Sequence, residues 1–508
     1  MSTTFEDFRN SADEFSTIPV FEQFFIDTIT PIQIFQKLKE AASFILESKD
    51  SHSKWARYSF IGLNPYVVLQ EENNRFIART TTGKTIADQK RFRDALLETL
   101  SNLKPKPLDI QIPFAGGGVG YIGYDGISEF EPALAPHPVN DLNVPNFYFS
   151  FCETIIAYDH DLKEITVITH VFLNERNQNK PLETLYDEAK AKIRKIMTLI
   201  TKEDANNSYT LHMPKQILDV NFDNLKTNFE KDAFLQAVRK IKDYIEQGEI
   251  SQVVISQRFE RDISVTGLDV YRVLRIINPS PYMFYLKFKD FEVVGSSPEK
   301  LIQVNNGHIE IHPIAGTRPR GRTKEEDERL VQDLLHDKKE LEEHEMLVEL
   351  AKEEIARVAK KGTVAVPSYM EIGYFSHVMH IISRVSGILA DDALPIDALI
   401  SAFPAGTLTG APKLRAMEII REVEPMARNL YGGAIGYIGF DGNIDSCIAI
   451  RSMLIHNQKA YIQAGAGVVN DSIPEREWEE TRNKAKALIK AIEIAEQLFQ
   501  KKGVGQNV

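Results

Sequence analysis

Cysteine is scarce in this chain of 508 residues, which contains only Cys152 and Cys447. This scarcity excludes a disulfide scaffold and favours a reducing compartment, the cytoplasm. Basic residues are outnumbered, since 60 Lys and Arg against 72 Asp and Glu give a formal net charge of −12. That balance disfavours non-specific binding to nucleic acid. No apolar run approaches the roughly 20 residues that span a bilayer, and the first residues, MSTTFEDFRNSADEF, lack the features of a secretory signal. We therefore expect a soluble cytoplasmic protein that binds neither nucleic acid nor a membrane.

Several catalytic motifs are also missing. The sequence has no GxSxG nucleophile motif and neither a CxxC nor an HExxH pattern for zinc. A GxGxxG pattern does occur, within 116-GGGVGYIGYDG-126, but no helical run follows it, so we reject a dinucleotide site there. The same segment is echoed by 432-GGAIGYIGFDG-442. This echo predicts two equivalent strand–turn elements, one in each half of the chain.

The composition indicates a globular protein, with 43% hydrophobic and 26% charged residues. Its length predicts two lobes. Strands are expected to cluster without regular βαβ alternation, which predicts an α+β fold of large, mostly antiparallel sheets sandwiched by helices. We read residues 30–48 as one helix and residues 55–70 as strands broken at Gly62 and Asn64-Pro65. The polar stretch 201–216 is the expected linker, and it divides an N-terminal lobe (1–215) from a C-terminal lobe (216–508).

Two predicted helices carry the same acidic pattern beside an apolar face. In 475–500, Glu477, Glu480 and Lys484 share one face, and in 338–358 Glu340 and Glu343 are again three residues apart. Either helix alone would be read as having a solvated flank. Together, the two carboxylate pairs could converge on one hard cation through oxygen ligands.

Other candidates are weaker when each is taken alone. Thr407 lies in the Gly-rich stretch 404–413 before a helix, which suits either an anion or an ordinary capped loop. Gly465 and Gly467 could let backbone amides reach a carboxylate. We read Arg451 as lying within a strand and paired with a carboxylate, from a substrate or from an Asp or Glu of the protein. His380 and Glu299 would more often be a core histidine and a surface carboxylate. The pattern as a whole indicates acid–base and metal chemistry on a small anion.

These stretches together resemble the large subunits of anthranilate synthases, a family of chorismate-utilising enzymes. The resemblance extends over most of the chain, and its motifs are ILES (45–48), RYSFIG (57–62), NPSPYMF (278–284), GSSPE (295–299), PIAGTRPRG (313–321), EEHEML (342–347), SHVMH (376–380), AGTLTGAPK (405–413), DSCIAIR (445–451), GAG (465–467) and PEREWEETRNKA (474–485). It implies that ammonia adds to ring carbon 2 of chorismate as the 4-hydroxyl leaves. Pyruvate is then lost and anthranilate forms.

The resemblance also implies roles for individual residues. Glu340, Glu343, Glu477 and Glu480 would be Mg²⁺ ligands, Glu299 the general acid for the leaving hydroxyl, and His380 the residue that serves pyruvate elimination. The residues implied to bind chorismate are Gln252, Thr317, Thr407, Tyr431, Arg451, Gly465, Gly467 and Lys484. The N-terminal lobe would be regulatory. The residues that resemble a tryptophan feedback pocket are Leu46, Ser48, Pro279, Tyr282, Met283 and Tyr437.

Two positions distinguish this chain from relatives of the same fold. Isochorismate and salicylate synthases have a lysine that activates water where this chain has Gln252, and aminodeoxychorismate synthases have a nucleophilic lysine where it has Ala315. Both positions favour amination at ring carbon 2. The alternatives are an aminodeoxyisochorismate or aminodeoxychorismate synthase or, from another class, a non-catalytic tryptophan-binding homologue.

One stretch departs from the family pattern. Residues 349-ELAKEEIA-356 replace a usual Arg-Asn-Asp set, which leaves every implied metal ligand in place. The resemblance covers no glutamine amidotransferase segment. Ammonia would therefore be free or supplied by a separate glutaminase subunit, in a hetero-oligomer.

Overall fold

The computed structural model describes residues 1–49, 57–108, 110–173, 180–202, 219–374 and 378–499. Most of the expected linker over 201–216 lies outside these residues. The helices are α1 (Phe5–Ser11), α2 (Pro31–Lys37), α3 (Phe92–Leu103), α4 (Ile127–Phe130), α5 (Leu182–Thr201), α6 (Lys231–Glu246), α7 (Gly267–Ile277), α8 (Lys324–Leu335), α9 (Lys338–Ala356), α10 (Pro395–Ala402), α11 (Lys413–Val423) and α12 (Pro474–Phe499), with short 3₁₀ turns η2 (Tyr124–Gly126), η3 (Phe222–Asn224) and η4 (Gly406–Leu408).

The strands up to the middle of the chain are β1 (Thr17–Phe25), β2 (Ala42–Glu47), β3 (Tyr58–Glu72), β4 (Arg75–Thr80), β5 (Thr85–Gln89), β6 (Gly117–Ile122), β7 (Phe147–Asp159), β8 (Glu164–Phe172), β9 (Lys226–Thr227), β10 (Gln252–Asp262) and β11 (Tyr282–Lys287). The remaining strands are β12 (Phe291–Ser297), β13 (Lys300–Asn305), β14 (His308–Ile311), β15 (Ile314–Pro319), β16 (Ala365–Tyr374), β17 (Val378–Ile388), β18 (Gly410–Ala411), β19 (Ala434–Gly439), β20 (Ile444–Ile448), β21 (Ser452–His456) and β22 (Lys459–Val468).

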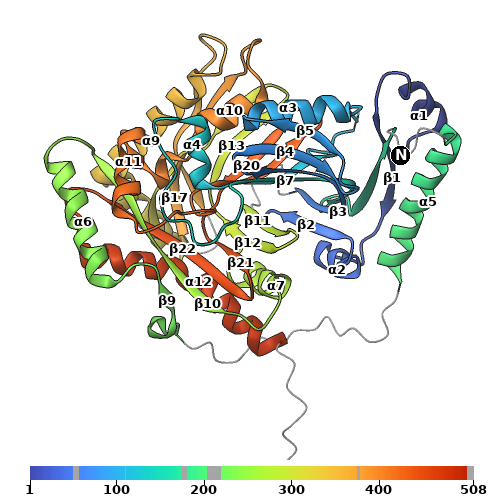
Figure 1. Ribbon diagram of the computed structural model, residues 1–508. Helices are drawn as coiled ribbons and strands as arrows, with labels where there is room; N and C mark the ends of the chain where they lie inside the picture. The colour runs from blue at the N-terminus through green and yellow to red at the C-terminus, as the bar shows by residue number, and fades with distance from the viewer. Residues whose placement is uncertain (50–56, 109, 174–179, 203–218, 375–377, 500–508) are drawn as a thin grey trace, which may run out of the picture.

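The long strands β3 and β7 pair with each other and join two arms of antiparallel sheet (Figure 1). One arm runs from β7 through β6, β19, β20, β13 and β14 to β17, which pairs with β15 and β16. The other arm runs from β3 through β2, β11, β12, β21 and β22 to β10. The predicted α+β class with large antiparallel sheets is therefore confirmed.

The two glycine-rich echoes form neighbouring strands. β6 and β19 pair antiparallel, with Gly120 opposite Gly436. A Cβ on Gly120 would lie 1.8 Å from the Tyr148 carbonyl oxygen, and one on Gly436 would lie 2.1 Å from the Asp445 carbonyl oxygen. Glycine is needed at both positions because the adjacent backbones approach so closely. The echo thus marks the place where the first half of the chain pairs with the second.

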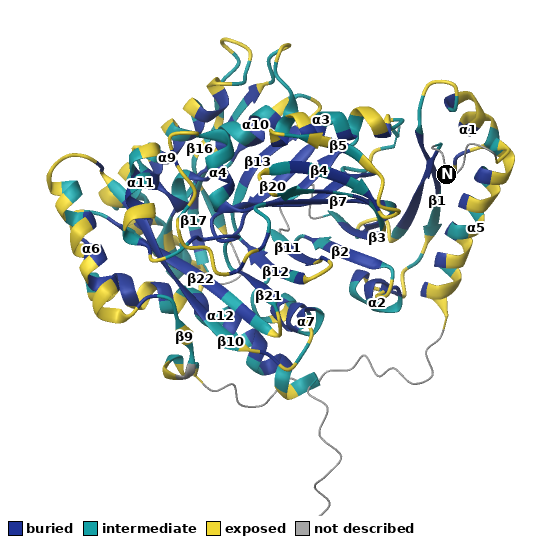
Figure 2. Cartoon of the chain, viewed as in Figure 1, coloured by how far each residue is buried: buried dark blue, intermediate teal, exposed yellow. Residues whose placement is uncertain are grey.

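Helix α12 buries the face that its periodicity predicts. Trp478, Ala485, Leu488, Ile492 and Ala495 are buried, and the helix packs against β22, α6 and α7. Figure 2 shows the same arrangement throughout the molecule, with buried strands inside and the exposed faces of α5, α6 and α9 outside. No helix in the described ranges is both long and apolar enough to cross a membrane.

The prediction of one helix over residues 30–48 is wrong. Thr30 caps α2, with a capping box to Gln33, but α2 ends at Lys37. Residues 42–47 form β2, which lies between β3 and β11 and is buried on both faces. Pairing on both sides outweighs the local helical pattern, as tertiary context often does.

Two predicted strand boundaries are also wrong. β3 continues through Gly62 and Pro65. Proline has no N–H to donate to the neighbouring strand, and a bulge between Pro65 and Val67 accommodates it. Conversely, Arg451 lies between β20 and β21 with φ of +48°, rather than within one strand. This left-handed conformation breaks the strand.

Candidate active site

A cavity of about 850 Å³ lies where the two arms meet α9 and α12. All the catalytic, substrate-binding and metal-binding residues expected from the sequence line it: Gln252, Glu299, Thr317, Glu340, Glu343, His380, Thr407, Tyr431, Arg451, Gly465, Gly467, Glu477, Glu480 and Lys484. These residues come from segments more than 200 positions apart in the chain. Their roles stay predictions, but the fold brings them to one place.

The four glutamates lie in two pairs. Burial, and then the charge of Glu343, raises the pKa of Glu340 on α9, and burial likewise raises the pKa of Glu477 on α12, with the charge of Glu480 adding to it. The charge of Lys339 on α9 lowers the pKa of Glu477, so the two helices face each other within electrostatic reach. In the described ranges, no group of three or more His, Cys, Asp or Glu forms a ready-made metal cage. Two carboxylate pairs on one cavity suit Mg²⁺, which usually takes one or two protein carboxylates and completes its shell with water and substrate.

Lysine 484 links the acidic pair of α12 to the glycine-rich end of β22. Its Nζ donates to the Gly465 carbonyl oxygen at 3.0 Å and lies 2.7 Å from Glu480 Oε1. A lysine held in this way places a positive charge beside the backbone at Gly465 and Gly467. This wall of the cavity therefore suits a carboxylate.

Glu299, between β12 and β13, is the cavity carboxyl best suited to donate a proton. Burial raises its pKa from 4.5 to about 7, although a hydrogen bond from Thr407 and the charge of Lys484 act in the opposite direction. Thr407 Oγ1 donates to Glu299 Oε1 at 2.8 Å. A carboxyl with a pKa near neutrality carries a proton for a substantial part of the time, as a general acid requires.

His380, on β17, lies opposite Thr317 of β15. Its Nδ1 is 2.8 Å from the Gly316 carbonyl oxygen and 3.1 Å from Thr317 Oγ1. Because a carbonyl can only accept, Nδ1 carries the proton and Nε2 is the basic nitrogen of the neutral ring. Burial lowers the pKa of His380, so the neutral ring predominates near pH 7. This histidine can accept a proton.

Arg451 extends into the cavity from the break between β20 and β21. Burial lowers the pKa of its guanidinium, while Tyr431 and Glu480 act in the opposite direction. Among the residues that the structure describes, its guanidinium forms no ion pair with Asp or Glu. The alternative of an internal salt bridge therefore finds no support here, and the guanidinium can take a carboxylate from a ligand.

The two glycines of β22 keep the cavity open. A Cβ on Gly465 would lie 2.6 Å from Tyr431 Oη, and a Cβ on Gly467 would lie 2.8 Å from Gln252 Nε2. Both distances are shorter than side-chain contacts allow. The absence of side chains here leaves room for Tyr431 and Gln252 to face a ligand.

Several cavity residues were not identified from the sequence, among them the polar residues Gln463 and Lys339. Gln463 precedes Gly465 and Gly467 at the alternation that places residues on one face of a strand, and this signal could have identified it. Lys339 is next to Glu340 at the start of α9, where a lysine is usually solvated. Lys339 lines the cavity only because α12 lies nearby, where the charge of Lys339 lowers the pKa of Glu477.

A second cavity of about 540 Å³ contains most of the expected regulatory residues. Leu46, Ser48, Tyr282, Met283 and Tyr437 line it, whereas Pro279 lines the larger cavity instead. Its walls come from both halves of the chain, since β2 pairs with β11.

One polar contact in this second cavity is well defined. Tyr282 Oη donates to Asp445 Oδ1 at 3.0 Å, and burial raises the pKa of Asp445 to about 6. The two cavities share Pro281, Pro298 and Ile314 as lining residues. They are therefore neighbours across a thin wall.

Comparison with known proteins identifies the family. Residues 42–490 match the family described as chorismate binding enzyme. The chain is 49% identical over 495 residues to anthranilate synthase component 1 of Geobacillus stearothermophilus, covering 97% of each chain. A crystal structure of anthranilate synthase component I from Streptococcus pneumoniae TIGR4 matches with a TM-score of 0.74 and 34% identity, over 92% of this chain and 99% of that one.

A more distant structure shares the fold. The menaquinone-specific isochorismate synthase MenF of Escherichia coli matches with a TM-score of 0.67 at 19% identity, over 96% of this chain and 98% of that one. The family match, the full-length relatives and the shared fold all agree with the residues gathered in the larger cavity. The chain therefore belongs to the chorismate binding enzyme family and, within it, to the group of anthranilate synthase component 1 proteins.

Proposed function

We propose that this chain is the large subunit of an anthranilate synthase, a chorismate-utilising lyase of tryptophan biosynthesis. It aminates chorismate with ammonia to 2-amino-2-deoxyisochorismate and then eliminates pyruvate to give anthranilate. The observation that carries this proposal is the meeting of Glu299, His380, Arg451 and the two glutamate pairs in one cavity. Acid, base, anion-binding and metal-binding groups are then all within reach of one small substrate.

The substrate is held by its two carboxylates. Arg451, which has no internal ion pair among the described residues, binds one carboxylate in bidentate fashion. The backbone at Gly465 and Gly467, with Lys484 beside it, lies against the same ligand. Thr317, Tyr431 and Gln252 line the space left for the ring.

Glu340, Glu343, Glu477 and Glu480 would hold Mg²⁺, directly or through water. A cation would fit here, because the charge of Glu343 raises the pKa of Glu340 and the charge of Glu480 raises that of Glu477, in addition to burial, so the carboxylates of each pair repel each other. When bound, the ion neutralises negative charge on the substrate near the departing groups. The protein's own part is to keep the four carboxylates on one side of the cavity.

Glu299 acts in the amination step. Ammonia forms a bond to ring carbon 2 while the bond from carbon 4 to its hydroxyl breaks, and Glu299 gives its proton so that water leaves. Hydroxide would otherwise be a poor leaving group. With a pKa of about 7, Glu299 is protonated often enough for this task at neutral pH.

His380 acts in the elimination step. Its neutral Nε2 takes the proton from carbon 2 as the bond from carbon 3 to the enolpyruvyl oxygen breaks. The ring becomes aromatic, and the released enolpyruvate takes up a proton to form pyruvate. The hydrogen bond from Nδ1 to Gly316 keeps the ring in the tautomer that this step needs.

The choice of nucleophile follows from Gln252 and Ala315. An amide does not act as a base at neutral pH, so Gln252 cannot activate water. Ala315 cannot attack the ring as a lysine would. Ammonia, either free or delivered by a separate glutamine amidotransferase subunit in a hetero-oligomer, is then the nucleophile.

Tryptophan, the end product, would occupy the second cavity and inhibit the enzyme. An occupant that presses on Pro298 would move the adjacent Glu299, because Pro298 lines both cavities. The division into a regulatory lobe over 1–215 and a catalytic lobe over 216–508 stays a prediction. Inhibition would act through their shared sheet.

The reaction products test this function. Purified chain is given chorismate, Mg²⁺ and ammonium, and anthranilate fluorescence is followed while products are separated by chromatography. Anthranilate and pyruvate in equal amounts support the proposal. Accumulation of 2-amino-2-deoxyisochorismate indicates an aminodeoxyisochorismate synthase, and tryptophan binding without turnover indicates a non-catalytic homologue. Repeating the assay with glutamine, with and without a glutaminase subunit, identifies the source of ammonia.

A further inference from the structure

The segment between α11 and β19 contains a deeply buried ion pair. Arg428 and Glu424 are 3% and 5% exposed. Arg428 Nη2 lies 2.6 Å from Glu424 Oε1, and Nε donates to Oε2 at 2.9 Å, so the pair is bidentate. A buried ion pair adds little net stability compared with apolar side chains. Its other contacts point to a different purpose.

The remaining donors of Arg428 hold two stretches of backbone that line the larger cavity. Nη1 donates to the Leu408 carbonyl oxygen at 2.8 Å, and Nη2 donates to the Val254 carbonyl oxygen at 2.7 Å. Leu408 directly follows Thr407, the residue that donates to Glu299. Arg428 is therefore one residue away from the hydrogen bond on the proposed general acid.

Arg428 also supports an aromatic wall. Its guanidinium carbon lies 5.5 Å from the ring centroid of Tyr431 and 4.6 Å from that of Tyr124. Tyr431 lines the larger cavity, and its hydroxyl group occupies the space that a side chain at Gly465 would need. Cation–π contacts of this kind fix the position of a ring.

Glu424 extends the same network to strands β10 and β22. Its Oε1 accepts hydrogen bonds from both the backbone N–H and the hydroxyl of Ser256, each at 2.8 Å. Gln463 Nε2 in turn donates to Ser256 Oγ at 2.8 Å, and Gln463 lines the cavity.

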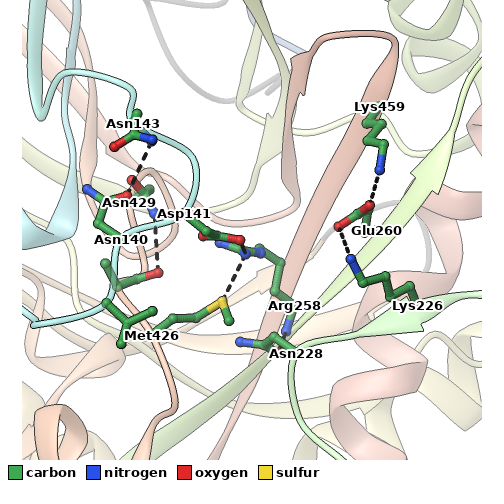
Figure 3. A network of polar contacts seen from close by, with 12 residues as sticks. Asn140, Asp141, Asn143, Lys226, Asn228, Arg258, Glu260, Met426, Asn429 and Lys459 are labelled. Carbon is green, nitrogen blue, oxygen red and sulfur yellow. Dashed lines mark hydrogen bonds and ion pairs between the residues drawn. The ribbon is translucent and has the colours of Figure 1, made fainter.

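The segment that carries this pair is also held from outside. In Figure 3, Arg258 approaches the sulfur of Met426, and the donor–acceptor distance is 2.9 Å. The backbone N–H of Asn429 donates to Asp125 Oδ2 at 2.7 Å. The position of Arg428 is thus fixed on both sides.

We propose that Arg428 and Glu424 are positioning residues for the reaction: their buried ion pair sets Thr407, Tyr431 and Gln463 against the substrate and, through Thr407, orients the carboxyl of Glu299. This inference rests on the proposed function, because it assigns the acid role to Glu299. Neither residue lines the larger cavity. Their effect passes through the backbone at Leu408 and Val254.

The proposal makes a specific demand on the pH profile. The hydrogen bond from Thr407 lowers the pKa of Glu299. Arg428→Lys keeps the positive charge. A single ammonium group, however, cannot form the hydrogen bonds that the planar guanidinium donates to Glu424 and to the carbonyl oxygens of Leu408 and Val254. The loop with Thr407 then relaxes, and the pKa of Glu299 rises. We expect the alkaline limb of the kcat profile to move upward by about 0.5–1 pH unit, the size of one hydrogen bond.

The experiment compares kcat and KM against pH for the unmodified chain and five variants. Arg428→Lys and Glu424→Gln disturb the pair, Thr407→Val removes the hydrogen bond directly, and Arg428→Lys with Thr407→Val combines the two changes. Arg57→Lys is the control, since the half-exposed Arg57 also forms a bidentate pair, with Asp159, and lines neither cavity. Thermal unfolding is measured for each variant.

The expected result is an upward shift of the alkaline limb in Arg428→Lys that matches Thr407→Val and grows no further in the combined variant. We also expect kcat of Arg428→Lys to fall by about tenfold, because a misplaced proton donor reduces the rate by at least this much. Arg57→Lys should leave the limb unchanged. An unmoved limb in Arg428→Lys, or shifts that add in the combined variant, would overturn the inference.

Two further outcomes keep the test decisive. If Arg428→Lys does not fold, Glu424→Gln is read in the same way, because it leaves Arg428 in place and weakens the ion pair together with the hydrogen bonds from Ser256. If the unmodified chain shows no alkaline limb near pH 7, or Glu299→Gln turns over normally, the proposed function fails rather than the positioning role.

Discussion

Glu299→Gln removes an ionisable carboxyl from the larger cavity and leaves its size nearly unchanged. In the folded chain the pKa of Glu299 is about 7, against an ordinary value of 4.5. A carboxyl whose pKa is raised on folding costs nothing below about pH 4.5, where it is protonated in both states. It destabilises the fold increasingly as the pH rises toward 7. Above that pH the full cost is present.

The size of this effect follows from the shift. A difference of about 2.5 units corresponds to about 3 kcal/mol at alkaline pH, and to about 1 kcal/mol near pH 5.5, because that pH is only one unit above the ordinary pKa of the unfolded chain. Glutamine is neutral at every pH. Glu299→Gln should therefore raise the free energy of unfolding relative to the unmodified chain at both pH values. This gain should be about 2 kcal/mol larger near pH 8.5 than near pH 5.5.

Activity should change in the opposite direction. Loss of a general acid costs about 10²–10⁴-fold in kcat. The assay pairs urea unfolding at the two pH values with anthranilate production from chorismate and ammonium. A variant that keeps its activity, or that gains the same stability at both pH values, would refute the assignment of Glu299 as a buried acid with a raised pKa.

Three further predictions address other parts of the site. Gly465→Ala places a Cβ 2.6 Å from Tyr431 Oη and 2.8 Å from the Ile255 carbonyl oxygen, so kcat/KM for chorismate should fall by about tenfold or more and the free energy of unfolding by about 1–3 kcal/mol; unchanged kinetics would show that the cavity wall can move aside. His380→Gln should still aminate chorismate but stall before pyruvate loss, so 2-amino-2-deoxyisochorismate accumulates in chromatographed reactions, and normal anthranilate yield would remove His380 from the elimination. Ser48→Phe fills part of the second cavity and should relieve tryptophan inhibition with near-normal activity otherwise; an unmoved inhibition curve would place the regulatory site elsewhere.

The sequence predicts best where a local pattern agrees with the tertiary fold. The apolar stripe of α12 and the acidic pairs of α9 and α12 repeat at helical spacing, and both helices form within a few residues of the expected bounds. Residues 116–126 and 432–442 were expected to be equivalent strands. Their direct pairing could not be known, because hydrogen bonding between distant segments leaves no local signal.

The failures share one physical cause. β2 reads as helix because Phe44, Ile45 and Leu46 suit either state, and only the strands on both sides of it decide. Arg451 sits inside an apolar run that resembles one strand, but its left-handed backbone turns the guanidinium out of the sheet and into the cavity. Strained backbone of this kind is common at functional sites, and it is not encoded by periodicity.

The buried network behind the site was beyond sequence reasoning. Glu424 and Arg428 follow a short helix whose end looks like an ordinary charged turn, with i and i+4 spacing typical of a surface pair. In the folded chain β10 and η4 bury this pair, which then contacts backbone carbonyls, the hydroxyl of Ser256 and the ring of Tyr431. Only the assembled sheet shows that a common surface motif is enclosed here.

The central claim is that acidic side chains from α9 and α12 hold one Mg²⁺ together beside the substrate. It is tested most directly by Mn²⁺ binding, measured by electron paramagnetic resonance in the presence of chorismate. The measurement uses Glu299→Gln chain, so that the substrate is not consumed, with and without Glu340→Gln or Glu480→Gln. The account predicts one ion per chain, with affinity reduced about tenfold or more by either change. Full affinity in both variants, or a loss confined to one helix, would contradict it.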